Sequence, residues 1–519
     1  MSITDSDVGT NELEKIYAEA SLVGEDKGKE LKFVWESDTR AFFEEQERNA
    51  TGKRGNRWSL ITIRLGINEE SILDSSKRYE EHIVERVKNG HLPPLKQGIL
   101  IWDETKVQSK IIWNSSNSSI TGYAMSSSDM ASLHDVYEGL DEEEESKKTE
   151  YVLQFLWRDI SSEFDVIGPY FTISGTIEAQ HLHTLVMKTL LVFNQFEFRV
   201  RCLLCDGASG NLALLKELCA HKKGKDISAN FVSPFDGNKI HLVICPSHQV
   251  SIDFLTYYMF PLFLLKNMIA ALYSSRDNGG TKSFVNEDSV HFGWETIEDV
   301  YKVDMKRAKN GQTRRVLKLK YSHIIRDSWT RLNVLPAKIM QQPYMLDAIQ
   351  ALADARPDEM KEHLATLEYL KACNKLFEDG ILSHQKVDQL SSKVLKNIDE
   401  GYAFFKKWKD SFSNDANLRE PTQKCFLAWQ TWDLLELMYH GFKGFCHDFL
   451  TEHPHYYIIP VRISGSAIES VFSCLKFISG SNLSSVNYSS SITALATQRE
   501  KTSNTNAENN YRNIPLSLK

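Results

Sequence analysis

Apolar residues along this chain occur either in short runs typical of strands or at the spacing of a helix. These two patterns divide the chain into strand-rich and helical parts. Short apolar runs bounded by turn residues predict strands at 98–102, 110–113, 120–125, 151–157, 170–173, 196–205 and 240–245. Helical spacing predicts helices between the later strands at 180–193 and 209–219. Long amphipathic helices are predicted at 344–355, 359–377, 384–408 and 424–450. The pattern therefore predicts an α/β fold interrupted by a largely helical insertion.

The same pattern suggests where the parts of the chain begin and end. Residues 1–55 are polar and acidic, which predicts a poorly ordered segment, and 56–95 have the spacing of a helix-turn-helix-like region. We expect the α/β core in two pieces, a helical insertion between them and a disordered tail. The expected bounds are 96–249 and 441–497 for the core, 250–440 for the insertion and 498–519 for the tail.

Composition is that of an ordinary globular protein, with 42% hydrophobic and 25% charged residues among 519. There are 61 Lys and Arg against 69 Asp and Glu, so the net charge is −8 and any contact with nucleic acid must be local. Eight cysteines, the first of them Cys202, are too few for a disulfide scaffold and suit a reducing compartment. The acidic N-terminal residues do not resemble a signal peptide, so secretion is not expected.

One apolar segment, residues 254–273, approaches the length of a membrane span. Pro261 divides it, and Lys266 and Asn267 interrupt it. Since no second candidate exists, we expect no membrane association.

Three acids are candidates for metal chemistry. Asp103 and Asp206 each follow an apolar strand, where α/β sheets place their sites. Clustered carboxylates are what a two-metal site for phosphoryl transfer needs. An Asp that starts a turn is the alternative for both residues. Glu469 is the third acid, although its spacing from Ser466 also fits a capping box.

Five segments in order resemble the P-element family of DNA transposases, which includes the THAP-domain transposases. They are GILIWDETKV, CLLCDGASGN, SPFDGNKIHLVICPSH, RDSWTRLNVLPAKIM and RISGSAIESVFSCLKFISG. The resemblance spans roughly residues 56–497, and five segments in one order are far more specific than any one of them.

This resemblance implies an RNase H-like fold in which Asp103, Asp206 and Glu469 bind two Mg²⁺ ions. The implied activity is DNA cleavage and strand transfer, with DNA as the partner and the nucleus as the place of action. The resemblance also implies that the helical insertion binds GTP and that the chain forms a homo-oligomer. No P-loop motif is present, so the GTP expectation depends on the resemblance alone.

Three features depart from the family pattern. No cysteine precedes Cys202, so the zinc-bearing THAP domain that commonly begins these proteins is missing from this sequence. Close relatives of the P element carry an Asp three residues before the last Glu, and Ser466 stands there. Residues 250–264 separate two segments that are joined in relatives, which suggests a retained intron and a dispensable stretch. A catalytically inactive DNA- or protein-binding module is therefore the alternative function.

Weaker features have ordinary explanations beside functional ones. Cys202 and Cys205 have zinc-like spacing but lie in an expected buried strand, which favours core packing. His248 fits either the site or a turn. The basic stretch 302–320 fits either phosphate binding or a solvated helix face, and its Lys and Arg residues are Lys302, Lys306, Arg307, Lys309, Arg314, Arg315, Lys318 and Lys320.

Overall fold

The structure is a computed structural model, and its described residues form two compact units. They are residues 69–110, 112–114, 119–121, 148–175, 177–219, 228–245, 263–276, 280–325, 335–413 and 422–504. Unit 1 lies within residues 1–242 and 467–516, and unit 2 lies mainly within 243–466. None of the helices found in the described ranges is both long and apolar enough to cross a bilayer.

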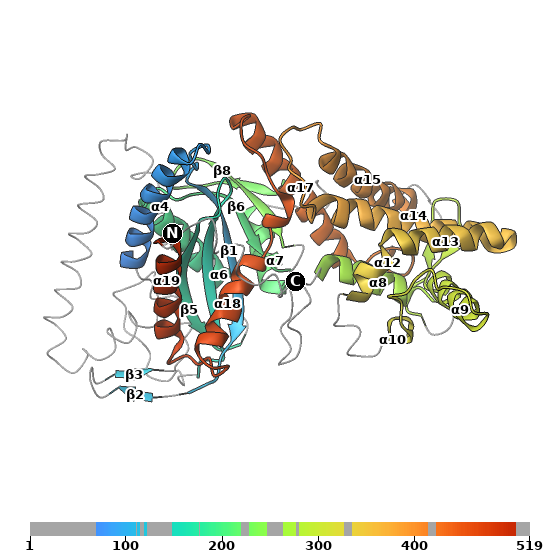
Figure 1. The fold of residues 1–519 in the computed structure, drawn as a ribbon, viewed down its shortest axis with the longest axis horizontal. Coiled ribbons are helices and arrows are strands. Elements are labelled where there is room, and N and C mark those ends of the chain that lie inside the picture. Colours follow the sequence, from blue (N-terminus) through green and yellow to red (C-terminus); the bar gives the residue numbers. More distant parts are fainter. Residues whose placement is uncertain are drawn as a thin grey trace, which may run out of the picture. The chain divides into compact units, whose positions relative to one another are not determined.

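A mixed six-stranded sheet forms the centre of unit 1 (Figure 1). Its strands, in spatial order, are β5 (Asp165–Ile173), β4 (Tyr151–Asp159), β1 (Gln97–Lys106), β6 (Arg199–Cys205), β8 (Lys239–Ile244) and β7 (Asn230–Val232). β1 runs antiparallel to β4 and parallel to β6. Its residues from Ile99 to Trp102 are all buried, so both faces of this central strand are covered.

Helices from both ends of the chain pack around this sheet (Figure 1). They are α4 (Glu69–Lys88), α6 (Ala179–Gln195), α7 (Ser209–Leu218), α18 (Ser466–Ile478) and α19 (Tyr488–Asn504). The buried Tyr79 fixes α4 to the sheet, because its hydroxyl donates to Asp159 Oδ2 at 3.2 Å and accepts from the Lys96 amide at 2.6 Å. The predicted strands at 110–113 and 120–125 correspond to β2 (Ile112–Asn114) and β3 (Ser119–Thr121), which pair antiparallel as a hairpin.

One glycine of β1 allows a close packing contact inside unit 1. A Cβ atom on Gly98 would lie 2.1 Å from the Trp157 ring, whose side chain is fully buried. The indole of Trp157 therefore occupies the space beside β1 that any larger residue would fill.

The described residues of unit 2 are mostly helical and include one short hairpin, β9 (Phe284–Val285) with β10 (His291–Phe292). Its longer helices are α8 (Phe263–Ser274), α9 (Glu295–Lys309), α13 (Pro343–Ala355), α14 (Met360–Leu376), α15 (Lys393–Ser413) and α17 (Trp429–Glu452). Shorter helical segments are α10 (Tyr321–Ile324), α12 (Leu335–Met340), η1 (Pro357–Glu359), η2 (Phe377–Ile381), α16 (Thr422–Cys425) and η3 (Pro460–Arg462). Aromatic rings of Phe284, Phe292, Tyr369, Phe405 and Trp408 contact one another in its core.

Two predicted helices differ from the observed ones. The helix expected from residue 384 begins only at Lys393, because Val387 exchanges two backbone hydrogen bonds with Ile458 and is extended there. The helix expected at 424–450 is divided into α16 and α17. Unit 2 also runs to Ser466, past the expected boundary at 440, and α17 packs there against α8 and α15.

Candidate active site

The pairing of β1 with β6 brings two of the predicted acids to the same level of the sheet. The last aligned pair of these parallel strands is Ile101 with Leu204. Asp103 and Asp206 each lie two residues further along, so continued register would place them side by side. Both are half-buried. Strand alignment therefore brings Asp103 of β1 and the residue that directly follows β6 to the same level of the sheet.

The third acid comes from the other end of the chain. Glu469 is half-buried in the first turn of α18, and its charge acts on Asp103. Burial raises the pKa of Asp103 well above its ordinary value, and the charges of Asp206 and Glu469 raise it further. Asp206 and Glu469 thus both lie near enough to Asp103 for their charges to raise its pKa. The capping role considered for Glu469 stays a prediction.

A hydrogen-bonded chain holds Asp206 in place. Its Oδ1 atom accepts from the Ala208 amide at 3.0 Å and from Asn211 Nδ2. Asn211 Oδ1 in turn accepts from the indole N–H of the buried Trp102 at 2.9 Å. Because the indole can only donate, it fixes which end of the Asn211 amide faces the acid. The sequence reasoning missed Asn211, although it ends the segment CDGASGN and lies in the first turn of α7.

A fourth acid, Glu104, lies beside this cluster. Successive strand residues point to opposite faces, so Glu104 lies on the Trp102 face and Asp103 on the other. Glu104 keeps part of its surface exposed, but crowding by the surrounding protein and then the charge of Asp206 raise its pKa to about 7. The negative field of the site therefore reaches both faces of β1.

The face that carries Asp103 is covered by α19. Asp103 is aligned with Gln154 on β4, and Gln154 with Tyr170 on β5. The Tyr488 hydroxyl of α19 donates to Gln154 Oε1 at 3.1 Å, and its ring lies 4.9 Å from that of Tyr170. The buried Gln154 side chain also donates to the carbonyl oxygens of Gly168 and Pro169. Gln154, Tyr170 and Tyr488 therefore cover the Asp103 face on the side of β4 and β5.

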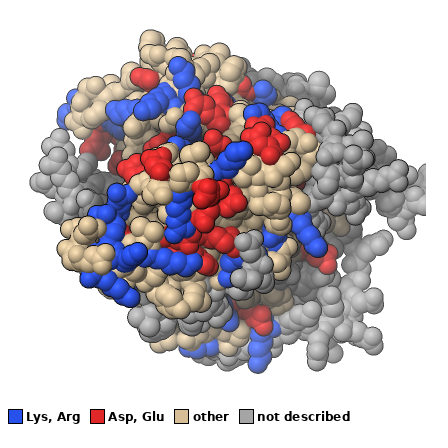
Figure 2. Space-filling model, turned by 90° about the vertical axis from the view of Figure 1, so that its right-hand side faces the viewer, with Lys and Arg blue, Asp and Glu red and all other residues tan. Residues whose placement is uncertain are grey.

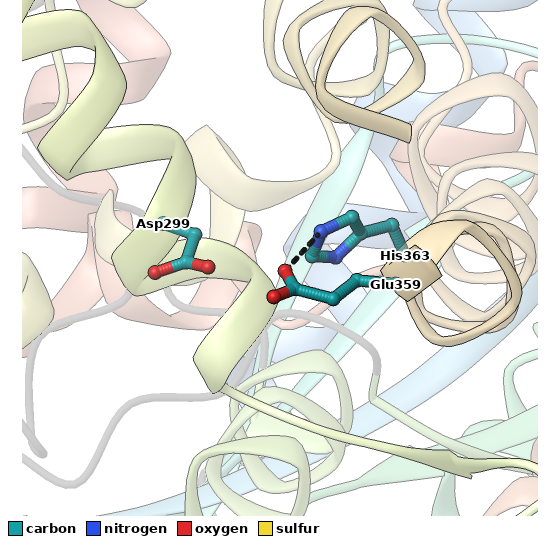
Figure 3. Close-up of side chains that lie close together, drawn as sticks. All are labelled: Asp299, Glu359 and His363. Atoms are coloured by element: carbon teal, nitrogen blue, oxygen red, sulfur yellow. Dashed lines mark ion pairs between the residues drawn. The ribbon is translucent and has the colours of Figure 1, made fainter. Parts of the chain in front are cut away.

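A second group of metal-ligating side chains occurs in unit 2, formed by Asp299, Glu359 and His363 (Figure 3). Arg356 Nη1 lies 2.5 Å from Asp299 Oδ2 and 2.9 Å from Glu359 Oε2. Burial alone would raise the pKa of Asp299, but hydrogen bonds from Lys302 and Arg356 lower it overall. A guanidinium therefore already occupies the position between the carboxylates that a cation would take, and we interpret the group as an ion-pair cluster.

The remaining candidates divide into buried residues and residues outside the described ranges. Cys202 and Cys205 are buried in β6, and three positions apart on a strand they point to opposite faces, which does not suit one metal ion. Residues 246–262, with His248 and most of the suspected insertion, lie outside the described residues. So do residues 326–334, which belong to the segment RDSWTRLNVLPAKIM of the resemblance.

Comparisons with known proteins show what this fold is similar to. Residues 77–219 match the family model described as TNP-like, RNase H N-terminal domain, and this segment contains Asp103 and Asp206. Among solved structures, the Drosophila P element transposase strand transfer complex has a similar fold, with a TM-score of 0.54 and 14% sequence identity. The similarity covers 77% of this chain and 76% of that one. No curated protein matches the chain.

These findings confirm the predicted fold class, an RNase H-like mixed sheet interrupted by a largely helical insertion. They also support the resemblance to P-element-like transposases. At 14% identity, the structural similarity establishes the fold and leaves the activity to be argued from the site.

The raised pKa of Glu104 predicts a pH dependence of stability in the absence of divalent cations. Its folded pKa of about 7 lies above the ordinary 4.5, so the stability it contributes is complete below about 4.5 and is lost as pH rises through 7. Glu104→Gln removes this loss, so the variant should gain stability relative to wild type between pH 5 and 8. Urea denaturation in EDTA measures the difference, with the exposed Glu150→Gln as control. Parallel pH profiles for wild type and Glu104→Gln would contradict the prediction.

Proposed function

We propose that this chain is a P-element-like DNA transposase whose unit 1 cleaves DNA and transfers strands, with Asp103, Asp206 and Glu469 binding two Mg²⁺ ions. The observation that carries the proposal is the electrostatic coupling of Asp103 to both other acids, across 366 residues of sequence. Starting a turn or capping a helix is a local role, and neither role requires a carboxylate to lie near another one. The matched RNase H N-terminal domain supports the same conclusion.

The donor set suits Mg²⁺. Hard dications prefer carboxylate oxygens, and the three acids supply only such atoms. Burial, and after it the charges of Asp206 and Glu469, raises the pKa of Asp103, so a bound dication would relieve an unfavourable field. When bound, the ions supply Lewis-acid stabilisation to the attacking and leaving oxygens of a phosphodiester.

The residues of the chain itself orient the ligands. Asp103 lies within β1, Asp206 directly follows β6, and α18 supplies Glu469. Asn211 and the Ala208 amide engage one oxygen of Asp206 and so fix the rotation of its carboxyl group. Because a two-metal site tolerates little misplacement, this orientation matters more than the hydrogen bonds contribute to stability.

The proposed partner is DNA, and the proposed place of action is the nucleus. GTP binding by unit 2 and assembly into a homo-oligomer belong to the proposal through the resemblance. The Drosophila complex was solved as a strand transfer complex, which supports DNA as the partner.

One feature of the site favours the second candidate, an inactive DNA- or protein-binding module. Ser466 stands where close relatives of the P element carry an Asp, and its hydroxyl lies 2.9 Å from that of Ser464. A hydroxyl supplies no charge to a metal site, so the acid count is one lower than in those relatives. The following comparison separates the two candidates.

Asp206→Asn should abolish Mg²⁺-dependent DNA cleavage, because it keeps the shape of the side chain and removes a charged ligand. Nicking of plasmid DNA by purified protein measures this activity. Asp236→Asn, at an exposed turn after β7, makes the same charge change as a control and should cleave like wild type. Equal cleavage by wild type and Asp206→Asn would reject the catalytic role. DNA binding without cleavage by any of the three proteins would favour the inactive module.

Asn211→Ala should weaken Mn²⁺ binding, since it removes the side chain that orients Asp206. Loss of such an outer partner typically lowers metal affinity about 10- to 100-fold. Calorimetric titration of Mn²⁺ measures the change without reference to cleavage. Asn230→Ala, on the edge strand β7, removes another hydrogen-bonded asparagine and should bind Mn²⁺ like wild type. An unchanged Mn²⁺ affinity in Asn211→Ala would show that Asp206 needs no such support.

A further inference from the structure

Positive charge is concentrated in one segment of unit 2, residues 305–325. This segment consists of the end of α9, the loop that follows and the short helix α10, and we call it the basic hairpin. It contains seven Lys and Arg residues and no Asp or Glu. The rest of the chain has 54 Lys and Arg, from 61 minus 7, against 69 Asp and Glu, a net charge of −15. Figure 2 shows acidic and basic side chains interspersed over one side of the molecule. Seven Lys and Arg residues without a single Asp or Glu therefore make this segment a local concentration of positive charge.

The backbone of the basic hairpin is held by a buried acid just before it. Asp304, 2% exposed on α9, accepts hydrogen bonds from Arg314 Nε at 2.9 Å and from the amides of Arg315 and Val316. Arg314 also donates to the carbonyl oxygens of Val316 and Leu319. Asp304 and Arg314 thus neutralise each other and fix the loop after α9. The other basic residues project from a defined scaffold.

Five basic side chains of the hairpin are exposed. Lys306 and Lys309 lie in the last turn of α9, and Arg315, Lys318 and Lys320 follow in the loop before α10. Within the described part of unit 2, none of these five forms an ion pair, whereas Lys302 just outside is paired with Asp299. Three large apolar side chains of the same segment, Leu317, Tyr321 and Ile325, are 67%, 61% and 54% exposed. The surface thus combines unpaired cations with exposed apolar groups.

We infer that the basic hairpin is a docking surface for the phosphate backbone of duplex DNA, separate from the three acids. The inference rests on the proposed function in taking DNA as the polyanion. A lysine ammonium is a mobile point charge, unlike the planar, bidentate guanidinium of arginine. It therefore suits contacts with phosphates, which do not distinguish one base sequence from another. An anionic membrane is the weaker partner, because the three exposed apolar residues lie in a loop and a four-residue helix with its following residue and do not form the continuous apolar face that interfacial helices bury.

The test compares two triple variants that change the net charge equally. The hairpin variant carries Lys306→Gln, Lys309→Gln and Lys318→Gln. The control variant changes three exposed lysines of α14 and α15, Lys361, Lys371 and Lys393, to Gln. Fluorescence anisotropy with a random-sequence DNA duplex gives the affinity over a range of salt concentrations. EDTA is present, so cleavage does not contribute.

Each lost phosphate contact should reduce the slope of log affinity against log salt by about 0.9. The hairpin variant should therefore show a slope smaller by about 2 to 3 and an affinity lower on the order of 10- to 100-fold at 0.1 M salt. The control variant should keep the wild-type slope. Equal slopes for the two triple variants, or tighter binding of wild type to anionic vesicles than to DNA, would overturn the inference.

The outcome is independent of catalysis. In the Asp206→Asn background the hairpin variant should lose DNA affinity by the same factor, since the two surfaces are distinct. If wild type and Asp206→Asn cleave DNA equally, the proposed function fails while the hairpin result stands. If wild type binds no duplex in EDTA, the hairpin inference fails while cleavage remains testable.

Discussion

Electrostatic repulsion among Asp103, Asp206 and Glu469 is the constraint on which the arrangement of unit 1 depends. Removal from water and neighbouring like charges both disfavour the ionised form of Asp103, and its pKa is raised first by burial and then by the charges of Asp206 and Glu469. The surrounding structure must hold the acids against this repulsion. It does so with a fully covered central strand, with α18 beside it and with hydrogen bonds from Asn211 and Ala208 to Asp206. Such locally unfavourable placement is typical of functional sites.

The sequence predicted much of unit 1 because its signals are local. Apolar runs marked β1, β4, β6 and β8, and helical spacing marked α6 and α7. The predictions erred where a contact with distant residues decided the structure. Val387 pairs with Ile458, a contact that no local sequence pattern predicts. The helix after Val387 therefore begins at Lys393 rather than at residue 384. Periodicity could not show this, because residues 384–392 have helical spacing but form tertiary contacts instead.

Asp103, Asp206 and Glu469 could be predicted as one site only because whole segments of the sequence resemble the transposase family. From spacing alone, each acid had an ordinary explanation as a turn or cap residue. The supporting residues were not predicted, because their roles depend on strand register. Trp102 looks like a core residue, and its indole reaches Asn211 only because β1 and α7 pack together. Glu104 follows Asp103 in sequence, yet its raised pKa depends on Asp206 from another strand.

A double-mutant cycle on Mn²⁺ affinity tests most directly whether the three acids act as one metal-binding unit. The variants are Asp103→Asn, Glu469→Gln and their combination, with affinity measured by calorimetry. If the two acids share ions, each single change should weaken binding strongly and the double change should cost clearly less than the sum. Strictly additive losses, or Mn²⁺ affinity unaffected by Glu469→Gln, would contradict the account.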